Sequence, residues 1–150
     1  MVANLLRTGM VLISWSSLLM YPKHSFRRFF PVVIFISSLV SILLVLSKPL
    51  NLWRVAGGTA AKIFNDLSFV LGPFIAATLW VFQLSYGSIW KYLGVNFVLD
   101  YLLAFPASAL FKRLKVYELE RLIPIYFFAA IYLFSIMGYA FQYIIRESRR

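Results

Sequence analysis

The segment FFPVVIFISSLVSILLVL, residues 29–46, carries no charged side chain and is followed by Ser47, Lys48 and Pro49. A helix that crosses a lipid bilayer needs about 20 mostly apolar residues, within a range of about 17–25. The segment has this length, and it ends where a polar side chain, a charge and a helix-breaking proline follow each other. It therefore predicts a transmembrane helix.

Three further segments have the same apolar character, and they cover residues 67–85, 90–111 and 122–145. The composition agrees, because 62% of the residues are hydrophobic and 13% are charged, against about 45–50% and about 25% in soluble domains. A soluble globule of 150 residues has too much surface for its volume to cover so many apolar side chains. We therefore expect an all-α integral membrane helical bundle, a single multi-pass domain over residues 1–150 with four transmembrane helices.

The N-terminal segment, residues 2–21, is long enough to cross but has a polar stripe. Asn4, Arg7, Ser14 and Ser17 recur at helical spacing, and Val11 is the apolar residue that interrupts them. This pattern fits a helix lying in the membrane interface, and it also fits a fifth transmembrane helix. Both alternatives stay open. No small-residue cleavage site follows the segment, so we expect it to remain in the mature protein.

The distribution of basic residues gives little information on sidedness. If the first segment does not cross, Lys and Arg divide seven against eight between the two sides of the membrane, which is no positive-inside signal. Arg27 and Arg28 directly precede the first predicted crossing, and first helices usually dominate orientation. This favours both termini in the cytoplasm.

The connection over residues 47–65 is more apolar than an ordinary loop. Its apolar side chains alternate with lysine and arginine, and Gly57 and Gly58 interrupt it. We predict a helical turn on the membrane surface, anchored by Trp53. Asn65 and Asp66 come directly before the 67–85 segment, where they would cap the first turn of the helix.

The chain has 15 Lys and Arg against 5 Asp and Glu, a net charge of +10. Because the bases lie between membrane-length apolar segments, we expect them to contact anionic lipid headgroups rather than nucleic acid. The predicted headgroup contacts are Arg27, Arg28, Lys112, Arg113 and Lys115.

Asp100 is the most informative single residue, because it lies near the middle of the 90–111 segment. A carboxylate at the centre of a membrane helix costs at least about 2.5–3.5 kcal/mol, and such residues face the bundle interior. Asn96, Ala104 and Ser108 share its helical face, and Pro106 loosens the helix just beyond it. Asp100 and Asn96 therefore form either an intramembrane ion or proton site or a hydrogen-bonded packing contact.

Small residues at helical spacing predict close helix packing. Gly72 with Ala76, Ala104 with Ser108, and Ser135 with Gly138 form three such notches. Copies not used within the bundle would serve as docking faces for a second copy or for another membrane protein.

Groups for catalysis or metal binding are sparse. The chain has no cysteine, and its one histidine, His24, lies in a basic loop, so a zinc site of the usual kind is not expected. No histidine lies in a membrane segment to activate a serine. Asp66 and Asp100 are expected to lie apart, and Glu118 and Glu120 are expected to pair with neighbouring Lys115 and Arg121. We expect no enzyme activity, no cofactor and no bound metal.

Three sequence features resemble those of a group of uncharacterised small multi-pass membrane proteins of Gram-positive spore-forming bacteria. They are RRFFP at residues 27–31 and NDLSFVLGP at residues 65–73, together with a last helix that ends in polar residues. The resemblance covers roughly residues 27–146, and it implies a multi-pass protein of the bacterial cytoplasmic membrane. It assigns no functional residues.

Two functions are compatible with these patterns. The first is a non-enzymatic membrane protein that acts through helix–helix contacts as an accessory or partner subunit. The alternative is a small transporter or channel component that uses the Asp100 face as an ion or proton site. A conduction path usually has several polar linings, whereas the sequence shows one polar stripe, so the first function is preferred at this point.

Overall fold

The computed structural model describes residues 1–148 and consists of five helical rods with short connections. Two rods are single helices near the N-terminus, α1 (Val2–Leu19) and α2 (Lys23–Ser47). The last rod is α7 (Pro124–Ser148). Each of the five rods is long enough and apolar enough to cross a membrane.

The two middle rods each contain a wider turn at a proline. The third rod consists of α3 (Gly58–Phe69), the π-helical turn η1 (Val70–Phe74) and α4 (Ile75–Ser85). The fourth consists of α5 (Ile89–Leu102), the π-helical turn η2 (Leu103–Ala107) and α6 (Ser108–Arg113). Proline lacks an N–H group and its ring collides with the preceding turn, and one wider turn relieves that collision.

These rods extend the predicted segments rather than replace them. The predicted helices at 29–46, 90–111 and 122–145 correspond to α2, to the α5–α6 rod and to α7. The predicted helix at 67–85 begins earlier, at Gly58. Asn65 and Asp66 therefore lie inside α3, and their predicted role as N-terminal caps is wrong. The cap position belongs to Gly57, which adopts a left-handed φ of 105°.

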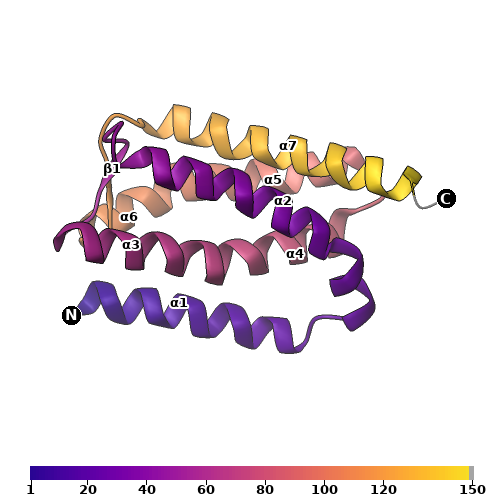
Figure 1. Ribbon diagram of the computed structural model, residues 1–150, viewed down its shortest axis with the longest axis horizontal. Coiled ribbons are helices and arrows are strands. Elements are labelled where there is room, and N and C mark those ends of the chain that lie inside the picture. Colours follow the sequence, from indigo (N-terminus) through magenta and orange to yellow (C-terminus); the bar gives the residue numbers. More distant parts are fainter. Residues whose placement is uncertain (149–150) are drawn as a thin grey trace.

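Consecutive rods lie side by side and run in opposite directions (Figure 1). Because there are five rods, the first rod begins and the last rod ends at opposite ends of the bundle. The Val2 end of α1 and the Ser148 end of α7 lie at opposite ends of the bundle. This differs from the predicted placement of both termini on one side. α1 packs against α3, η1 and α4, α2 packs between α4 and α7, and α5 packs against α4 and α7.

A short β-ladder covers one end of the bundle. β1 (Trp53–Arg54) pairs antiparallel with β2 (Glu118–Leu119), with Trp53 opposite Leu119. The predicted surface helix anchored by Trp53 is therefore wrong: Trp53 is buried, with 7% of its surface exposed. Because the ladder joins residues that are far apart in the sequence, no local sequence pattern predicts it.

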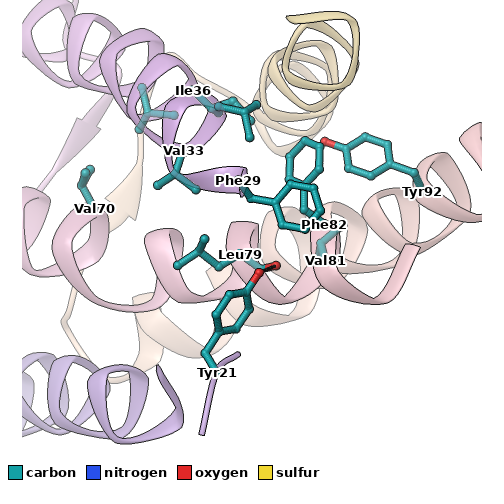
Figure 2. Packing of buried hydrophobic residues seen from close by; sticks show 11 residues of the cluster. Tyr21, Phe29, Val33, Ile36, Val70, Leu79, Val81, Phe82 and Tyr92 are labelled. Carbon is teal, nitrogen blue, oxygen red and sulfur yellow. Dashed lines mark hydrogen bonds between the residues drawn. The ribbon is translucent and has the colours of Figure 1, made fainter. Parts of the chain in front are cut away.

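The core lies mainly between α2 and α4. Phe29 and Ile36 of α2 meet Leu79 and Phe82 of α4, and Tyr92 of α5 closes the cluster (Figure 2). The hydroxyl of Tyr21 donates to the backbone carbonyl of Leu79 at 3.0 Å, which fixes the α1–α2 turn against α4.

The outer surface of the bundle is apolar, and α1 shows this most clearly. Its side chains at Leu5, Ile13 and Leu19 are 73%, 72% and 88% exposed. Its polar stripe points the other way: Arg7 and Ser14 are buried, and Ser17 accepts a hydrogen bond from Trp80 of α4. α1 therefore presents its polar face to the bundle and its apolar face outward.

Candidate ligand cavity

A cavity of about 270 Å³ lies between α2, the α3–α4 rod, α5 and α7. Its walls are mostly apolar or aromatic, with Trp53 and Leu119 of the β-ladder among them. The polar side chains come from the α3–α4 rod, α5, α7 and the segment before β2, and are Asn65, Asp66, Thr78, Tyr92, Asn96, Asp100, Tyr117 and Ser135. The single polar stripe of the sequence thus becomes a polar lining contributed by several elements.

Asp100 faces this cavity with little to neutralise it. The Ser135 hydroxyl of α7 lies 3.5 Å from its Oδ2, but the same hydroxyl lies 3.1 Å from the carbonyl of Ile131. A serine has one proton to donate, and the shorter contact takes it. No Lys, Arg or His is among the residues that line the cavity in the described chain. The Asp100 carboxyl group is therefore without a cationic partner.

Asn96 lies one turn from Asp100 and is buried, whereas Asp100 is half-buried. Its side-chain Nδ2 donates to the backbone carbonyl of Tyr92 at 2.9 Å. Asn96 and Asp100 both line the cavity from α5, and a functional role for the pair stays a prediction. The amide of Asn96 bonds to its own helix, however, and thereby holds its side chain beside Tyr92.

Asp66 is the second carboxylate of the cavity, and its environment differs. Its Oδ1 accepts from Trp53 Nε1 at 3.2 Å and from Asn65 Nδ2 at 3.3 Å. Its Oδ2 pairs with Lys62 Nζ at 3.1 Å, and that ammonium group lies 4.3 Å from the centre of the Trp53 ring. The Lys62 ammonium group therefore lies between the Asp66 carboxylate and the face of the Trp53 ring, and both attract a cation.

Arg7 extends this polar cluster to α1. Its guanidinium donates from Nε to Asn65 Oδ1 at 3.0 Å, from Nη1 to Asn4 Oδ1 at 2.7 Å and from Nη2 to the carbonyl of Val116 at 2.8 Å. Only 2% of the residue surface is exposed. One side chain of the polar stripe on α1 therefore connects α1, α3 and the segment before β2.

The two carboxylates line one cavity, Asp66 from α3 and Asp100 from α5, which leaves the prediction that they lie more than a hydrogen bond apart in place. They are not equivalent. Asp66 is surrounded by donors and has a lysine partner, whereas Asp100 has only the Ser135 hydroxyl, 3.5 Å away, and no basic partner among the described residues. The cavity therefore contains one satisfied carboxylate and one that is available to a cation from outside the chain.

The small residues predicted for packing are used mainly within the protein. A Cβ atom on Gly72 would lie 3.0 Å from the Cα of Val11 in α1, and one on Gly138 would collide with Ile36 of α2. Ala76, Ala104 and Ser108 are buried as well. Ser108 also donates to the carbonyl of Leu103 at 2.8 Å, which satisfies a backbone group in the wider turn η2. Ser135 lines the cavity.

The acidic residues near the β-ladder pair with other partners than the sequence suggested. Glu118 pairs with Lys112 at 2.6 Å, and Glu120 pairs with Arg54. The predicted pairs with Lys115 and Arg121 are wrong, because the ladder turns both carboxylates toward other elements. The hydrogen bond from Lys112, followed by its charge, lowers the pKa of Glu118 below its ordinary value of 4.5.

The predicted headgroup contacts lie at both ends of the bundle. Arg27 and Arg28 are exposed near the start of α2, and Lys112 and Arg113 close α6. Lys115 follows α6 and adopts a positive φ of 56°. Over residues 1–148, no group of three His, Asp or Glu side chains is arranged to hold a metal ion.

Comparison of the chain with models of protein families, with curated proteins and with solved structures finds no match. The residues and their geometry therefore supply the whole basis for a function.

Proposed function

We propose that the protein is an integral membrane protein whose five rods all cross the bilayer, α1 included. The orientation of α1 supports this proposal. An interfacial helix turns its polar face to water, whereas α1 turns Arg7 and Ser14 into the bundle and exposes Leu5, Ile13 and Leu19. Exposed apolar faces of this extent are unusual on soluble monomers and are the expected surface in contact with lipid tails.

Within that bundle, we propose a small transporter component that binds an organic cation in the cavity. The observation that carries this proposal is the unpaired Asp100 carboxyl group, which faces the cavity without a basic neighbour. A charged side chain at this depth costs at least about 2.5–3.5 kcal/mol, and a bound cation offsets that cost. Buried charges are generally paired for this reason.

The walls of the cavity limit the kind of cation. Phe69, Phe74, Phe127 and Phe134 are among the lining residues, and aromatic faces attract cations. A volume of about 270 Å³ lies just below the usual range for small-molecule sites, about 300–1,000 Å³. We therefore expect a small ammonium compound with an apolar body rather than a hydrated metal ion.

The Lys62 ammonium group is bound within the chain by the same two kinds of group, a carboxylate and an aromatic ring. It lies between the Asp66 carboxylate and the Trp53 ring, and both of these residues also line the cavity. The same bundle therefore already holds one ammonium group by a carboxylate and an aromatic ring. Asp100 offers the carboxylate for a second.

The test is binding of benzyltrimethylammonium, a permanent cation with an apolar ring, to the purified full chain in detergent micelles, measured by isothermal titration calorimetry. We expect saturable binding at one site, and at least tenfold weaker binding to Asp100→Asn, because the loss of a charge partner in a site of low dielectric costs at least about 1.4 kcal/mol. Circular dichroism verifies that the variant keeps its helix content.

Glu118→Gln is the matched control, since it removes one negative charge outside the cavity. It should bind benzyltrimethylammonium like the unaltered protein. Equal binding to Asp100→Asn and to the control would refute the proposed site. Equal binding of neopentylbenzene, the neutral carbon analogue, would show an apolar pocket without charge recognition. If binding is established, uptake of the cation into proteoliposomes tests the transporter part.

The accessory-subunit function, preferred on the sequence, stays a prediction. Its proposed docking faces were the small-residue notches, and contacts within the chain account for Gly72 and Gly138. Native mass spectrometry of the protein extracted from its own membrane would support it by finding a different protein at fixed stoichiometry.

A further inference from the structure

We infer that the end of the bundle formed by the α1–α2 turn carries a binding site for the headgroup of an anionic phospholipid. Four cationic or titratable side chains, Lys23, His24, Arg27 and Arg28, line one surface hollow there. All four are exposed and belong to the first two turns of α2. This site is independent of the cavity and of the function proposed for it.

The basic side chains that line this hollow take no part in the ion pairs of the described residues. The three ion pairs of the described residues are Arg54–Glu120, Lys62–Asp66 and Lys112–Glu118, and all of them lie near the β-ladder. Lys23, Arg27 and Arg28 form none within residues 1–148. Within the described residues, no ion pair therefore competes with an outside anion for Lys23, Arg27 or Arg28.

Arg28 is held in place by aromatic contacts. Its guanidinium carbon lies 5.2 Å from the centre of the Phe29 ring and 4.9 Å from that of Tyr86, at the α4–α5 turn. Arg146 of α7 approaches the same Tyr86 ring at 6.0 Å. Two like charges converge on one ring, which costs free energy unless an anion lies between or beside them. The Tyr86 hydroxyl is buried and has no hydrogen-bond partner.

The flanks of the hollow favour a lipid over a free phosphate ion. Phe26 and Phe30 stack on each other at 5.1 Å on α2, and they are 37% and 43% exposed. Their rings lie one residue before and two residues after the Arg27–Arg28 pair, which gives acyl chains an apolar surface beside the cationic one. A ligand that places a phosphate group at Arg27 and Arg28 and acyl chains on Phe26 and Phe30 is an anionic phospholipid.

Native mass spectrometry of the full chain in mild detergent tests this site. Phosphatidylglycerol and phosphatidylcholine with identical acyl chains are added in equal amounts, and the ratio of the two bound lipids is measured. We expect phosphatidylglycerol to be retained preferentially. Each cation near a phosphate is worth about fivefold in affinity, so Arg27→Gln with Arg28→Gln should lower phosphatidylglycerol binding about 25-fold.

The matched control is Lys48→Gln with Arg121→Gln, two exposed bases at the β-ladder end that form no ion pair within residues 1–148. It removes the same charge from the opposite end and should leave the lipid ratio unchanged. Arg27→Gln alone provides a milder variant, because the Arg27 side chain makes no packing contact comparable to that of Arg28, and it should lose about fivefold. Equal loss in the control pair would overturn the site in favour of a general attraction by net charge. Displacement of phosphatidylglycerol by millimolar inorganic phosphate would overturn the lipid assignment and identify a soluble anion as the ligand.

Discussion

The packing of α1 on the bundle can be tested by adding one methyl group at two different helical glycines. Gly72 lies in η1, where a Cβ atom would be 3.0 Å from the Cα and 3.4 Å from the backbone N of Val11. Gly94 lies in α5, where a Cβ atom would meet nothing within 4 Å. The substitutions Gly72→Ala and Gly94→Ala thus add the same atoms, one against backbone and one into open space.

The expected magnitudes follow from two opposing effects. Alanine in place of glycine favours a helix by about 0.8–1.0 kcal/mol, and this gain applies to both sites. Overpacking costs about 1–3 kcal/mol and applies to Gly72 alone, because the backbone of Val11 cannot turn aside as a side chain can. Gly94→Ala should therefore raise the free energy of unfolding by about 1 kcal/mol, and Gly72→Ala should lower it by up to about 2 kcal/mol.

The assay is reversible unfolding of the purified protein in mixed micelles by increasing fractions of sodium dodecyl sulfate, followed by far-ultraviolet circular dichroism. The difference between the two variants isolates the overpacking cost, since the helix preference cancels. If both alanine variants gained the same stability, α1 would not be docked on η1, and the five-rod arrangement would be refuted.

Two further predictions concern charged groups. Arg7→Met should lower the free energy of unfolding by about 3 kcal/mol, because a buried donor is lost while Asn65 and the Val116 carbonyl stay buried. Arg7→Lys keeps the charge and should lose less stability. Equal unfolding curves for the two variants would contradict the hydrogen-bond network of Arg7. Lys112→Gln should return the lowered pKa of Glu118 toward 4.5, as measured by nuclear magnetic resonance titration. Because the folded pKa is lowered, the contribution of this ion pair to stability is present above about pH 4.5 and is lost as the pH falls through the folded pKa, and an unchanged Glu118 titration in the variant would contradict the pairing.

The helices were predictable because membrane-length apolar segments depend on local composition alone. Residues 122–145 lie close to the bounds of α7, and residues 29–46 lie within α2, which begins six residues earlier at Lys23. Asp100 was also identified from the sequence, since a carboxylate in such a segment must face the interior. The same argument placed Asn96 on the face that lines the cavity.

Features that depend on contacts between distant segments were not predictable. Trp53 looked like an interfacial anchor because its neighbours are apolar and basic, whereas pairing with Leu119 buries it. Asn65 and Asp66 resembled a cap because they precede an apolar run, but the helix extends to Gly58 and makes them part of a buried cluster. The i, i+3 spacing of Asn4 and Arg7 was the one signal of that cluster, and its partners come from other elements.

The five-rod arrangement is the claim on which both proposed sites depend, and the absence of cysteine from the sequence makes it directly testable. Single cysteines are introduced as Val2→Cys, Lys48→Cys, Ser88→Cys and Ser148→Cys, and sealed vesicles are treated with a membrane-impermeant maleimide before and after lysis. Five crossings predict that positions 2 and 48 are labelled from one side and positions 88 and 148 from the other. Labelling of position 2 together with positions 88 and 148 would contradict the account, because it would leave α1 on the surface and both termini on one side.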